Sequence, residues 1–479
     1  MATGSRSSAR SGGAEPLDPE RRDWLAVGLT TLLVGLWAWR PLWDIDLFWH
    51  VVVGRLILDG GVPTQDVLSA ADPTAPWHTF QWGYEVLVAV IDSLGGLWGL
   101  KLFHWALFTS TAAAFMAALR AKGLPRAPSA GMLGVALLLV EDRLRARPHL
   151  FELLFVLALM PVLLRDPQRP PPSKAAELQT PLMLVLLAGL WFNLHAVSAL
   201  WWVALVGAWV VDRPSLVRGS TLAGGLLVGL GGGPARRGLI GAFSSHRSWP
   251  AELVPELQPT WAYGEAGAFG WAMLAGTTLG LLAAGHLIHA RAYRRGPLLA
   301  ALGTGIAALL MARWAWLALV PLTLWALWRR PSWLPVAGAL AFFGLAAHTL
   351  PRWSLEDRAQ VLEPGRFPVQ ACQQLSAHQL RVPLDTTPGW SGYLLYCLYP
   401  GGRVLADGRM VFGPQVTTLL LDREAGDLST FDRAVGQFHT QALVWPTETS
   451  PPLDPSRWRR VHQDPVAEIW LPKPMWGIW

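Results

Sequence analysis

Long apolar runs occupy most of the first 350 residues of the chain and then thin out. A helix needs about 20 predominantly apolar residues to cross the hydrocarbon core of a membrane. The pattern therefore predicts an α-helical polytopic membrane protein with about 11 transmembrane helices. The expected ranges are 24–40, 98–119, 127–141, 149–164, 180–194, 196–211, 219–234, 266–290, 297–311, 314–328 and 332–350.

Positive charge sets the expected orientation of these spans. Lys and Arg concentrate in cytoplasmic loops, and a cytoplasmic N-terminus makes every inside loop basic. No small-residue cleavage site follows the first apolar run, so we expect this run to be retained as the first span. Residues 1–23 then form a disordered cytoplasmic leader. An odd number of spans places residues 351–479 in the periplasm, beyond a bacterial inner membrane. The inside loops carry Arg120, Lys122, Arg126, Arg165, Arg169, Lys174, Arg213, Arg218, Arg291, Arg294, Arg295, Arg329 and Arg330.

The first outer loop, residues 41–97, is unusually long. Loops of more than about 12–15 residues are uncommon unless they are functional or disordered, and this one is too rich in Trp, Phe, Val and Leu to be disordered. Within it, residues 50–58 and 82–91 have the pattern of short amphipathic helices that lie in the membrane interface. We therefore expect residues 24–350 to form one transmembrane domain with a structured first loop.

Composition supports a membrane protein and excludes several other classes. The chain is 52% hydrophobic and 15% charged, against about 25% charged in an average soluble domain. It has 28 Trp and only 6 Tyr, and Trp is enriched at membrane–water interfaces. The net charge of +6 is accounted for by the inside loops, so a nucleic-acid partner is not expected. A simple soluble enzyme, a disordered chain and a disulfide scaffold are excluded.

Two carboxylates, Asp44 and Asp46, directly follow the first span, and His50 lies four residues after Asp46. Charge next to hydrocarbon is costly, which favours a use in base catalysis or cation binding. A helical spacing would place Asp46 and His50 on one face. The alternative is that solvated carboxylates cap a helix over 47–58.

Arginines mark two other outer positions. Arg143, Arg145 and Arg147 alternate between the third and fourth spans, where they could clamp a phosphate or extend to lipid headgroups. Arg313 opens the tenth span, and an arginine held there usually has an anionic partner. That partner is either the phosphate of a donor or an internal carboxylate, Glu85 or Asp46.

Asn193 and His195 end an apolar run on the outer side. They are either substrate-binding residues or members of interhelical hydrogen bonds.

The region from about 351 onward changes character, with more charge and shorter apolar runs. Segments beginning at Val382, Gly392, Arg403, Ala442 and Ala467 read as short strands between Gly and Pro turns. Helices are expected over 368–379 and 427–438, which gives a small soluble α/β domain. Cys372 and Cys397 could form one disulfide in an oxidising periplasm. Asp407-Gly408-Arg409 is interpreted as a turn with an ion pair rather than as an acceptor-recognition motif.

Several of these motifs together resemble polytopic bacterial membrane proteins of the GT-C glycosyltransferase type, over most of the chain. The resemblance implies a GT-C-like fold and a polyprenyl-phosphate-linked sugar as donor. It also implies that an acidic residue of the first outer loop, here Asp44 or Asp46, serves as base or metal ligand. If it is a metal ligand, the expected cofactor is a divalent cation, Mg or Mn. The motifs are Asp44–His50, Gly54–Leu58, Gly61–Pro63, Asp66–Ser69, Pro76-Trp77, Gln81–Glu85, Arg145–Pro148, Trp191–His195, Gly392-Tyr393 and Asp407–Arg409.

The expected function is transfer of a sugar from a polyprenyl phosphate to an extracytoplasmic acceptor, a glycan, lipid or protein. Asp44 and Asp46 are the catalytic candidates.

Two alternatives to this function stay open. A transporter or lipid flippase would show polar or broken spans around a midplane site. A catalytically inactive GT-C scaffold stays open because Gln81 and Gly233 stand where the resemblance predicts other residues. The phosphate-binding candidates are Arg143, Arg145, Arg147 and Arg313, and the substrate-binding candidates are His50, Glu85, Asn193 and His195.

Overall fold

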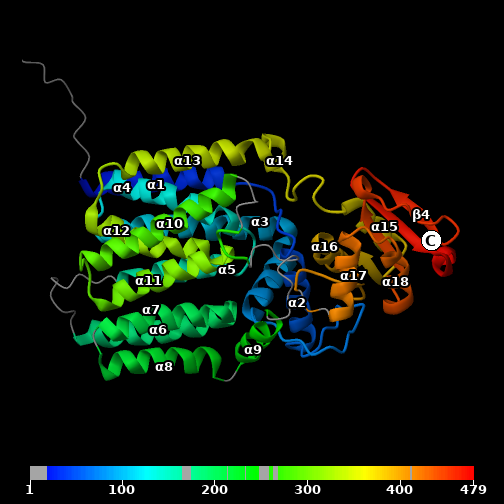
Figure 1. Cartoon of the computed structure of the whole chain (residues 1–479), viewed down its shortest axis with the longest axis horizontal. Helices are drawn as coiled ribbons and strands as arrows, with labels where there is room; N and C mark the ends of the chain where they lie inside the picture. The colour runs from blue at the N-terminus through cyan, green and yellow to red at the C-terminus, as the bar shows by residue number, and fades with distance from the viewer. Residues whose placement is uncertain are drawn as a thin grey trace, which may run out of the picture.

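The computed structural model describes residues 19–163, 174–212, 214–231, 233–246, 258–262, 268–409, 411 and 413–478. Most of the expected leader, residues 1–18, lies outside this set. Apolar helices run side by side in a bundle, and a mixed α/β unit caps one end of it (Figure 1). The bundle helices are α1 (Pro19–Ala38), the long α3 (Trp82–Ala121), α4 (Arg126–Val140), α5 (His149–Leu163), α6 (Lys174–Leu194), α7 (Ala199–Asp212), α8 (Leu216–Leu230), α10 (Ala268–His289), α11 (Arg295–Leu310), α12 (Leu319–Arg329) and α13 (Leu334–Thr349).

Every apolar segment expected to span a membrane coincides with one of these helices or with part of one. Within the described ranges, three helical stretches are long and apolar enough to cross a membrane by length and composition, namely Trp82–Ala121, Gly270–His289 and Leu334–Arg352. Shorter apolar helices account for most of the rest. The tenth expected segment begins as a 3-10 helix, η5 (Ala312–Ala318), before α12.

The helix α3 joins two segments that the sequence suggested were separate. Gly96 has φ 56° and ψ −152°, a conformation that costs glycine little and other residues much. The chain bends there, between the expected interfacial segment 82–91 and the expected span 98–119. The first part of α3 packs against α2 (Leu47–Gly60), which lies near the capped end of the bundle (Figure 1).

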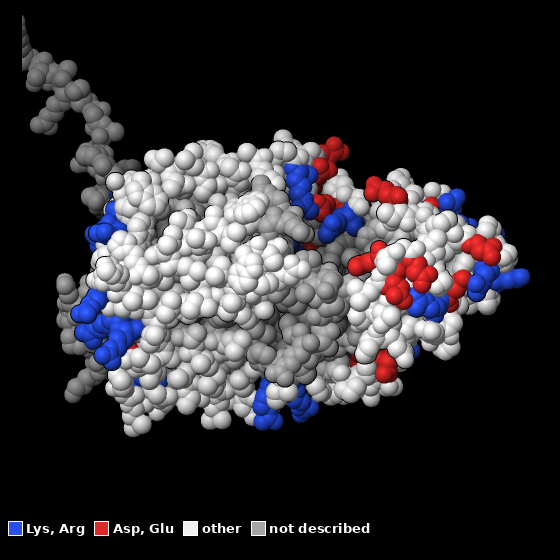
Figure 2. Space-filling model, in the orientation of Figure 1, with Lys and Arg blue, Asp and Glu red and all other residues white. Residues whose placement is uncertain are grey.

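Acidic side chains are concentrated on and near the α/β unit, whereas basic side chains lie both there and at the opposite end of the bundle, where few acidic ones are seen (Figure 2). The turns after α10 and α12 supply exposed arginines. These arginines belong to the loops that the sequence assigned to the cytoplasm. They are Arg291, Arg294, Arg295, Arg329 and Arg330.

The C-terminal unit contains a mixed five-stranded sheet among the described residues. Its strand order is β2-β1-β3-β5-β4. The strand β1 pairs in parallel with β2 and β3, while β5 pairs antiparallel with β3 and β4. The strands are β1 (Pro383–Thr386), β2 (Arg403–Val404), β3 (Ala442–Pro446), β4 (Trp458–Gln463) and β5 (Ala467–Pro472); the helices are α15 (Val369–Ala377), α16 (Pro388–Leu398), α17 (Pro414–Glu424) and α18 (Ser429–Phe438). The short helix α14 (Leu355–Ala359) lies at the end of α13, against the bundle (Figure 1).

The segment beginning at Gly392 differs from its predicted structure. It was expected to be a strand, but it lies in α16. An apolar run of this length suits a buried strand or a buried helix equally well, and Pro388 at the first turn favours helix initiation. The strand β4 and the helix α17 were not expected.

The first loop and the C-terminal unit share one hydrophobic core. Phe48 of α2 packs edge-on against Phe367 and Tyr393, with ring centroids 4.9 Å apart in both pairs. The backbone N–H of Val404 in β2 donates to Leu68 O, and that of Ala70 donates to Val404 O. A disulfide joins Cys372 of α15 to Cys397 of α16. The loop that follows α1 is therefore fixed between the bundle and the α/β unit.

Candidate functional site

A cavity of about 350 Å³ lies where the first loop, the bundle end and the C-terminal unit meet. Its walls come from α2, the start of α5, the chain between α6 and α7, the 3-10 helix η5 and the turn at 407–409. Six of the ten site residues expected from sequence line it. They are Asp46, His50, Arg143, Arg147, His195 and Arg313.

Arg147 binds both first-loop carboxylates. Its Nε lies 2.7 Å from Oδ2 of Asp44, and its Nη1 lies 2.9 Å from Oδ2 of Asp46. The other oxygen of Asp44 accepts the backbone N–H of Asp46 at 2.8 Å. Asp44 therefore has both oxygens engaged, and of the two carboxylates only Asp46 lines the cavity.

The turn that contains Gly408 closes over Asp46. A Cβ added to Gly408 would lie 2.1 Å from Oδ1 of Asp46 and 3.3 Å from Nε1 of Trp49. No other residue fits there without moving the carboxylate. The C-terminal unit thus forms the wall of the cavity that faces Asp46.

Arg409, the next residue, ties this turn to the first loop. Its Nη1 lies 2.5 Å from Oδ1 of Asp66, and its Nη2 lies 2.5 Å from Oδ2 of Asp407. The guanidinium also lies over the ring of Trp77, 4.9 Å from its centroid. All three ionised groups are buried, and a buried charge needs such partners. Arg409 therefore pairs with Asp407 inside the turn and also with Asp66 of the first loop.

His50 lines the same cavity from α2 and has buried polar neighbours. Its Nδ1 is 3.3 Å from Nε2 of Gln81 and 3.6 Å from Oε1 of Glu85. Burial, and then the charge of Arg147, lower the pKa of His50 well below its usual value, so the ring is neutral at pH 7. Glu85 is fully buried and accepts from Thr79 Oγ1 at 2.8 Å. It does not line the cavity, so the structure does not place it against a substrate there.

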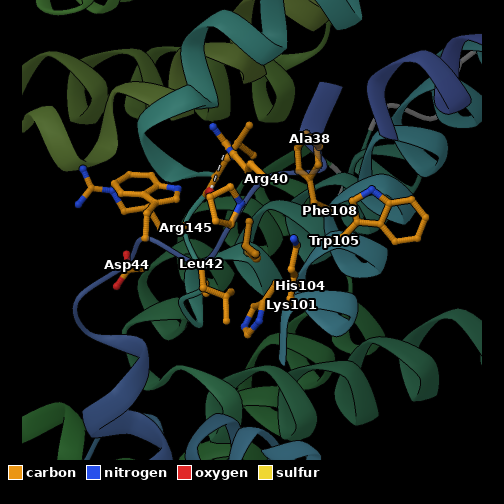
Figure 3. A pocket seen from close by; sticks show the side chains of 14 residues that line it. Ala38, Arg40, Leu42, Asp44, Lys101, His104, Trp105, Phe108 and Arg145 are labelled. Atoms are coloured by element: carbon orange, nitrogen blue, oxygen red, sulfur yellow. Dashed lines mark hydrogen bonds between the residues drawn. The ribbon is translucent and has the colours of Figure 1, made fainter. Parts of the chain in front are cut away.

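Arg145 points away from its two neighbours. Its guanidinium lies over the ring of Trp43, 4.9 Å from the centroid. Both residues line a separate cavity of about 50 Å³, together with Arg40, Lys101 and Asp44 (Figure 3). A turn causes the separation, because the N–H of Arg147 donates to the carbonyl of Arg145 at 2.7 Å. The expected clamp of three arginines is therefore divided between two cavities.

Asn193 makes one interhelical and one intrahelical hydrogen bond and does not line the larger cavity. Its Oδ1 accepts from Nε1 of Trp82 at 2.8 Å, and its amide donates to Gly189 O at 2.6 Å. These contacts fit the alternative considered from sequence. Arg313, by contrast, lines the cavity from η5.

The cavity also contains residues that the sequence analysis did not select. Glu152 is one of them, and an acidic residue inside the apolar run of α5 was a signal for it, since such residues are rare in spans. Four indoles line the same wall. The sequence did not indicate a role for these four, because Trp is abundant throughout the chain. They are Trp49, Trp77, Trp314 and Trp316.

No group of three or more His, Cys, Asp and Glu residues suited to a metal ion occurs in the described part of the chain. The two carboxylates that could share a cation, Asp44 and Asp46, instead share the guanidinium of Arg147. That arrangement does not fit a divalent ion between them, and we derive no step through one.

A second, apolar cavity of about 50 Å³ lies among α3, α4, α5 and α12. Trp316 lines both this cavity and the larger one. Apart from Thr111 and Thr323 its lining is hydrocarbon and aromatic. The polar site therefore borders an apolar space inside the bundle.

The described residues combine an apolar helical bundle, a structured first loop and a capping α/β unit. The chain is similar in structure to ArnT from Cupriavidus metallidurans, in a crystal structure with bound undecaprenyl phosphate. The TM-score is 0.53 at 12% sequence identity, and the match covers 95% of this chain and 98% of that one. At this identity the likeness is one of fold. No protein-family model and no curated protein sequence matches the chain.

Proposed function

We propose that this protein is an integral membrane glycosyltransferase that transfers a sugar from a polyprenyl phosphate to an acceptor outside the cytoplasm. The observation that carries the proposal is the large cavity, in which one carboxylate, Asp46, lies among arginines at the end of an apolar bundle. The solved structure of similar fold holds undecaprenyl phosphate, which supports the same class of donor here.

The proposal includes a topology. About eleven spans cross a bacterial inner membrane, the N-terminus is cytoplasmic, and the C-terminal unit is periplasmic. The basic turns at the far end of the bundle support this orientation, as does the disulfide in the C-terminal unit, because disulfides persist in oxidising compartments. The cavity then opens near the outer leaflet, where a lipid-linked donor and a periplasmic acceptor can meet.

In the proposed complex the arginines bind the donor phosphate. Arg143 and Arg313 line the cavity on the bundle side, and guanidinium groups form strong hydrogen bonds with phosphate oxygens. The apolar cavity that shares Trp316 would take the first isoprenoid units of the lipid. Four arginines line the larger cavity; Arg147 and Arg409 are held by first-loop and turn carboxylates, so the phosphate is assigned to Arg143 and Arg313.

Asp46 contacts the reacting groups in this proposal. Its carboxylate, fixed by Arg147 and by the turn at Gly408, stabilises the positive charge that develops at the anomeric carbon as the phosphate departs. Asp44 holds Arg147 in place and has no free oxygen for the substrate.

The transporter alternative predicts a midplane site within broken spans. The described cavity is formed instead at the helix ends that face the C-terminal unit, by residues that directly follow α6 and α11 and by the first turn of α5. That placement favours chemistry on an outer substrate over passage through the bundle.

Binding of undecaprenyl phosphate tests the donor assignment. A charged hydrogen bond contributes about 1.5–3 kcal/mol, so Arg143→Gln combined with Arg313→Gln should weaken binding by on the order of 10²-fold. Undecaprenol, which lacks the phosphate, should bind equally weakly to both proteins. The matched control is Arg294→Gln with Arg295→Gln, because these exposed arginines belong to the turn before α11. Unchanged binding by the cavity variant would contradict the proposal.

A further inference from the structure

Glu152 and His195 form a carboxylate–imidazole pair on the wall of the cavity. Oε1 of Glu152 lies 2.7 Å from Nδ1 of His195, although 43 residues separate them in sequence. Both residues line the cavity that contains Asp46. The side chain of Glu152 is 6% exposed, whereas that of His195 retains 14% exposure.

The pair fixes which nitrogen of His195 carries the proton. An ionised carboxylate only accepts hydrogen bonds, so Nδ1 is the donor to Glu152. In the neutral ring, Nε2 then carries the lone pair. Within the described part of the chain Nε2 makes no hydrogen bond. The side chain of His195 lines the cavity and is partly exposed, so the lone pair of Nε2 is available to a substrate.

The local structure holds both groups in place. Glu152 lies in the first turn of α5 and also accepts from Oγ of Ser198 at 3.2 Å. His195 is extended, with φ −159° and ψ 99°, where α6 ends. The next backbone N–H, that of Ala196, donates to Phe80 O at 2.7 Å. Such fixed geometry is what a proton-transfer group needs.

The first-loop carboxylates are engaged elsewhere. Asp44 uses one oxygen for Arg147 and the other for the backbone of Asp46, and Asp46 also accepts from Arg147. Two other imidazoles line the cavity. Nδ1 of His50 contacts the amide of Gln81, and Nε2 of His149 lies 2.8 Å from the carbonyl oxygen of Arg143. Among these groups, Nε2 of His195 is therefore the best placed to accept a proton in the cavity.

We propose that His195 is the general base of the transfer and that Glu152 is its positioning residue. The inference rests on the proposed function and deepens it. The acceptor hydroxyl gives its proton to Nε2 of His195 while its oxygen bonds to the anomeric carbon. The bond between that carbon and the phosphate oxygen breaks, and its electron pair leaves with the polyprenyl phosphate. Glu152 stabilises the imidazolium, which later returns its proton to water.

The test measures release of undecaprenyl phosphate from undecaprenyl-phosphate glucose, mannose and arabinose in the presence of a bacterial envelope extract. General base catalysis contributes about 10²–10⁴-fold, so His195→Ala should lower kcat by that factor, and added imidazole should restore part of it. Glu152→Gln should lower kcat and leave KM for the donor unchanged. The controls are His289→Ala and Glu356→Gln, at exposed positions outside the cavity.

The outcomes separate this inference from the proposed function. If the wild-type protein releases no lipid phosphate from any donor, the proposed function fails and the inference falls with it. If the wild type is active and His195→Ala is equally active, the proposed function stands and the base assignment is overturned. Loss of activity without rescue by imidazole, together with weakened binding of undecaprenyl phosphate, would give His195 a structural role and would also overturn the assignment.

Discussion

Arg147 donates to Asp44 through Nε at 2.7 Å, and this contact joins two chain segments separated by 103 residues. The side chain of Asp44 is 1% exposed and that of Arg147 is 12% exposed. The pair fixes the loop after α1 against the start of α5. It also orients the guanidinium toward Asp46, so it supports the part of the cavity in which we place the reacting sugar.

Neutralising Asp44 should destabilise the protein. Removing one partner of a buried ion pair costs about 3–5 kcal/mol, because the other charge is left uncompensated. We expect Asp44→Asn to lower the unfolding temperature in detergent clearly, as followed by Trp fluorescence. Asp72→Asn is the matched control, since Asp72 is exposed in the same loop and bonds only within its own turn. Equal unfolding temperatures for the two variants would argue against a stabilising Asp44–Arg147 pair.

A methyl group at Gly408 should impair transfer and leave the fold intact. The added Cβ would displace Oδ1 of Asp46, and a misplacement of about 1 Å in a catalytic group can cost on the order of 10²-fold in rate. Release of lipid phosphate by Gly408→Ala measures this loss. Gly413→Ala serves as control, because nothing lies within 4 Å of its Cβ position and its φ of −71° suits any residue. A fully active Gly408→Ala protein would mean that Asp46 is not constrained as described.

The stability of the protein should fall on acidification because of His50. Burial and Arg147 lower its pKa in the folded state, so the unfolded chain binds the extra proton first. Stability is complete above the unfolded value, about 6.5, and decreases as the pH falls below it, by at most about 1.4 kcal/mol per pH unit. His50→Gln should flatten the pH dependence of the unfolding temperature between pH 7 and 5, and His289→Gln should not. Parallel profiles for wild type and His50→Gln would refute a neutral buried His50.

Reduction should destabilise the C-terminal unit. The disulfide Cys372–Cys397 closes a loop with a sequence separation of 25 residues, for which loop-closure entropy predicts about 3 kcal/mol. Thiol alkylation before and after reduction, read by mass spectrometry on protein from native membranes, detects the bond. We expect both thiols to be protected until reductant is added. Free thiols in the untreated protein would place the C-terminal unit in a reducing compartment and invert the proposed topology.

The positions of the bundle helices could be predicted because length and continuous apolarity are local properties of the sequence. The segment at Gly392 was predicted wrongly because its apolar run does not distinguish a helix from a strand, and its burial between α2 and the sheet depends on tertiary packing. The clamp of Arg143, Arg145 and Arg147 was also predicted wrongly, because the sequence did not reveal the turn at Arg145. Alternate residues share a face only in an extended chain, and here the chain turns.

The candidate site was predictable only in part. The charges of Asp46 and Arg313 stand out next to apolar runs, and both lie on the cavity wall. The pairs Glu152–His195 and Asp66–Arg409 join residues that are far apart in sequence, so no spacing rule could connect them. The motif at Asp407 looked like an ordinary turn because its partner lies in the first loop.

The most direct test of the proposed function is release of undecaprenyl phosphate by purified protein from undecaprenyl-phosphate-linked glucose, mannose and arabinose, with an envelope extract as the source of acceptors. We expect the wild type and Asp72→Asn to release lipid phosphate from at least one donor, with the sugar recovered on an acceptor. Asp46→Asn should reduce that release by on the order of 10²-fold or more. Release that is indifferent to Asp46→Asn, or no release from any donor, would contradict a glycosyltransferase site in this cavity.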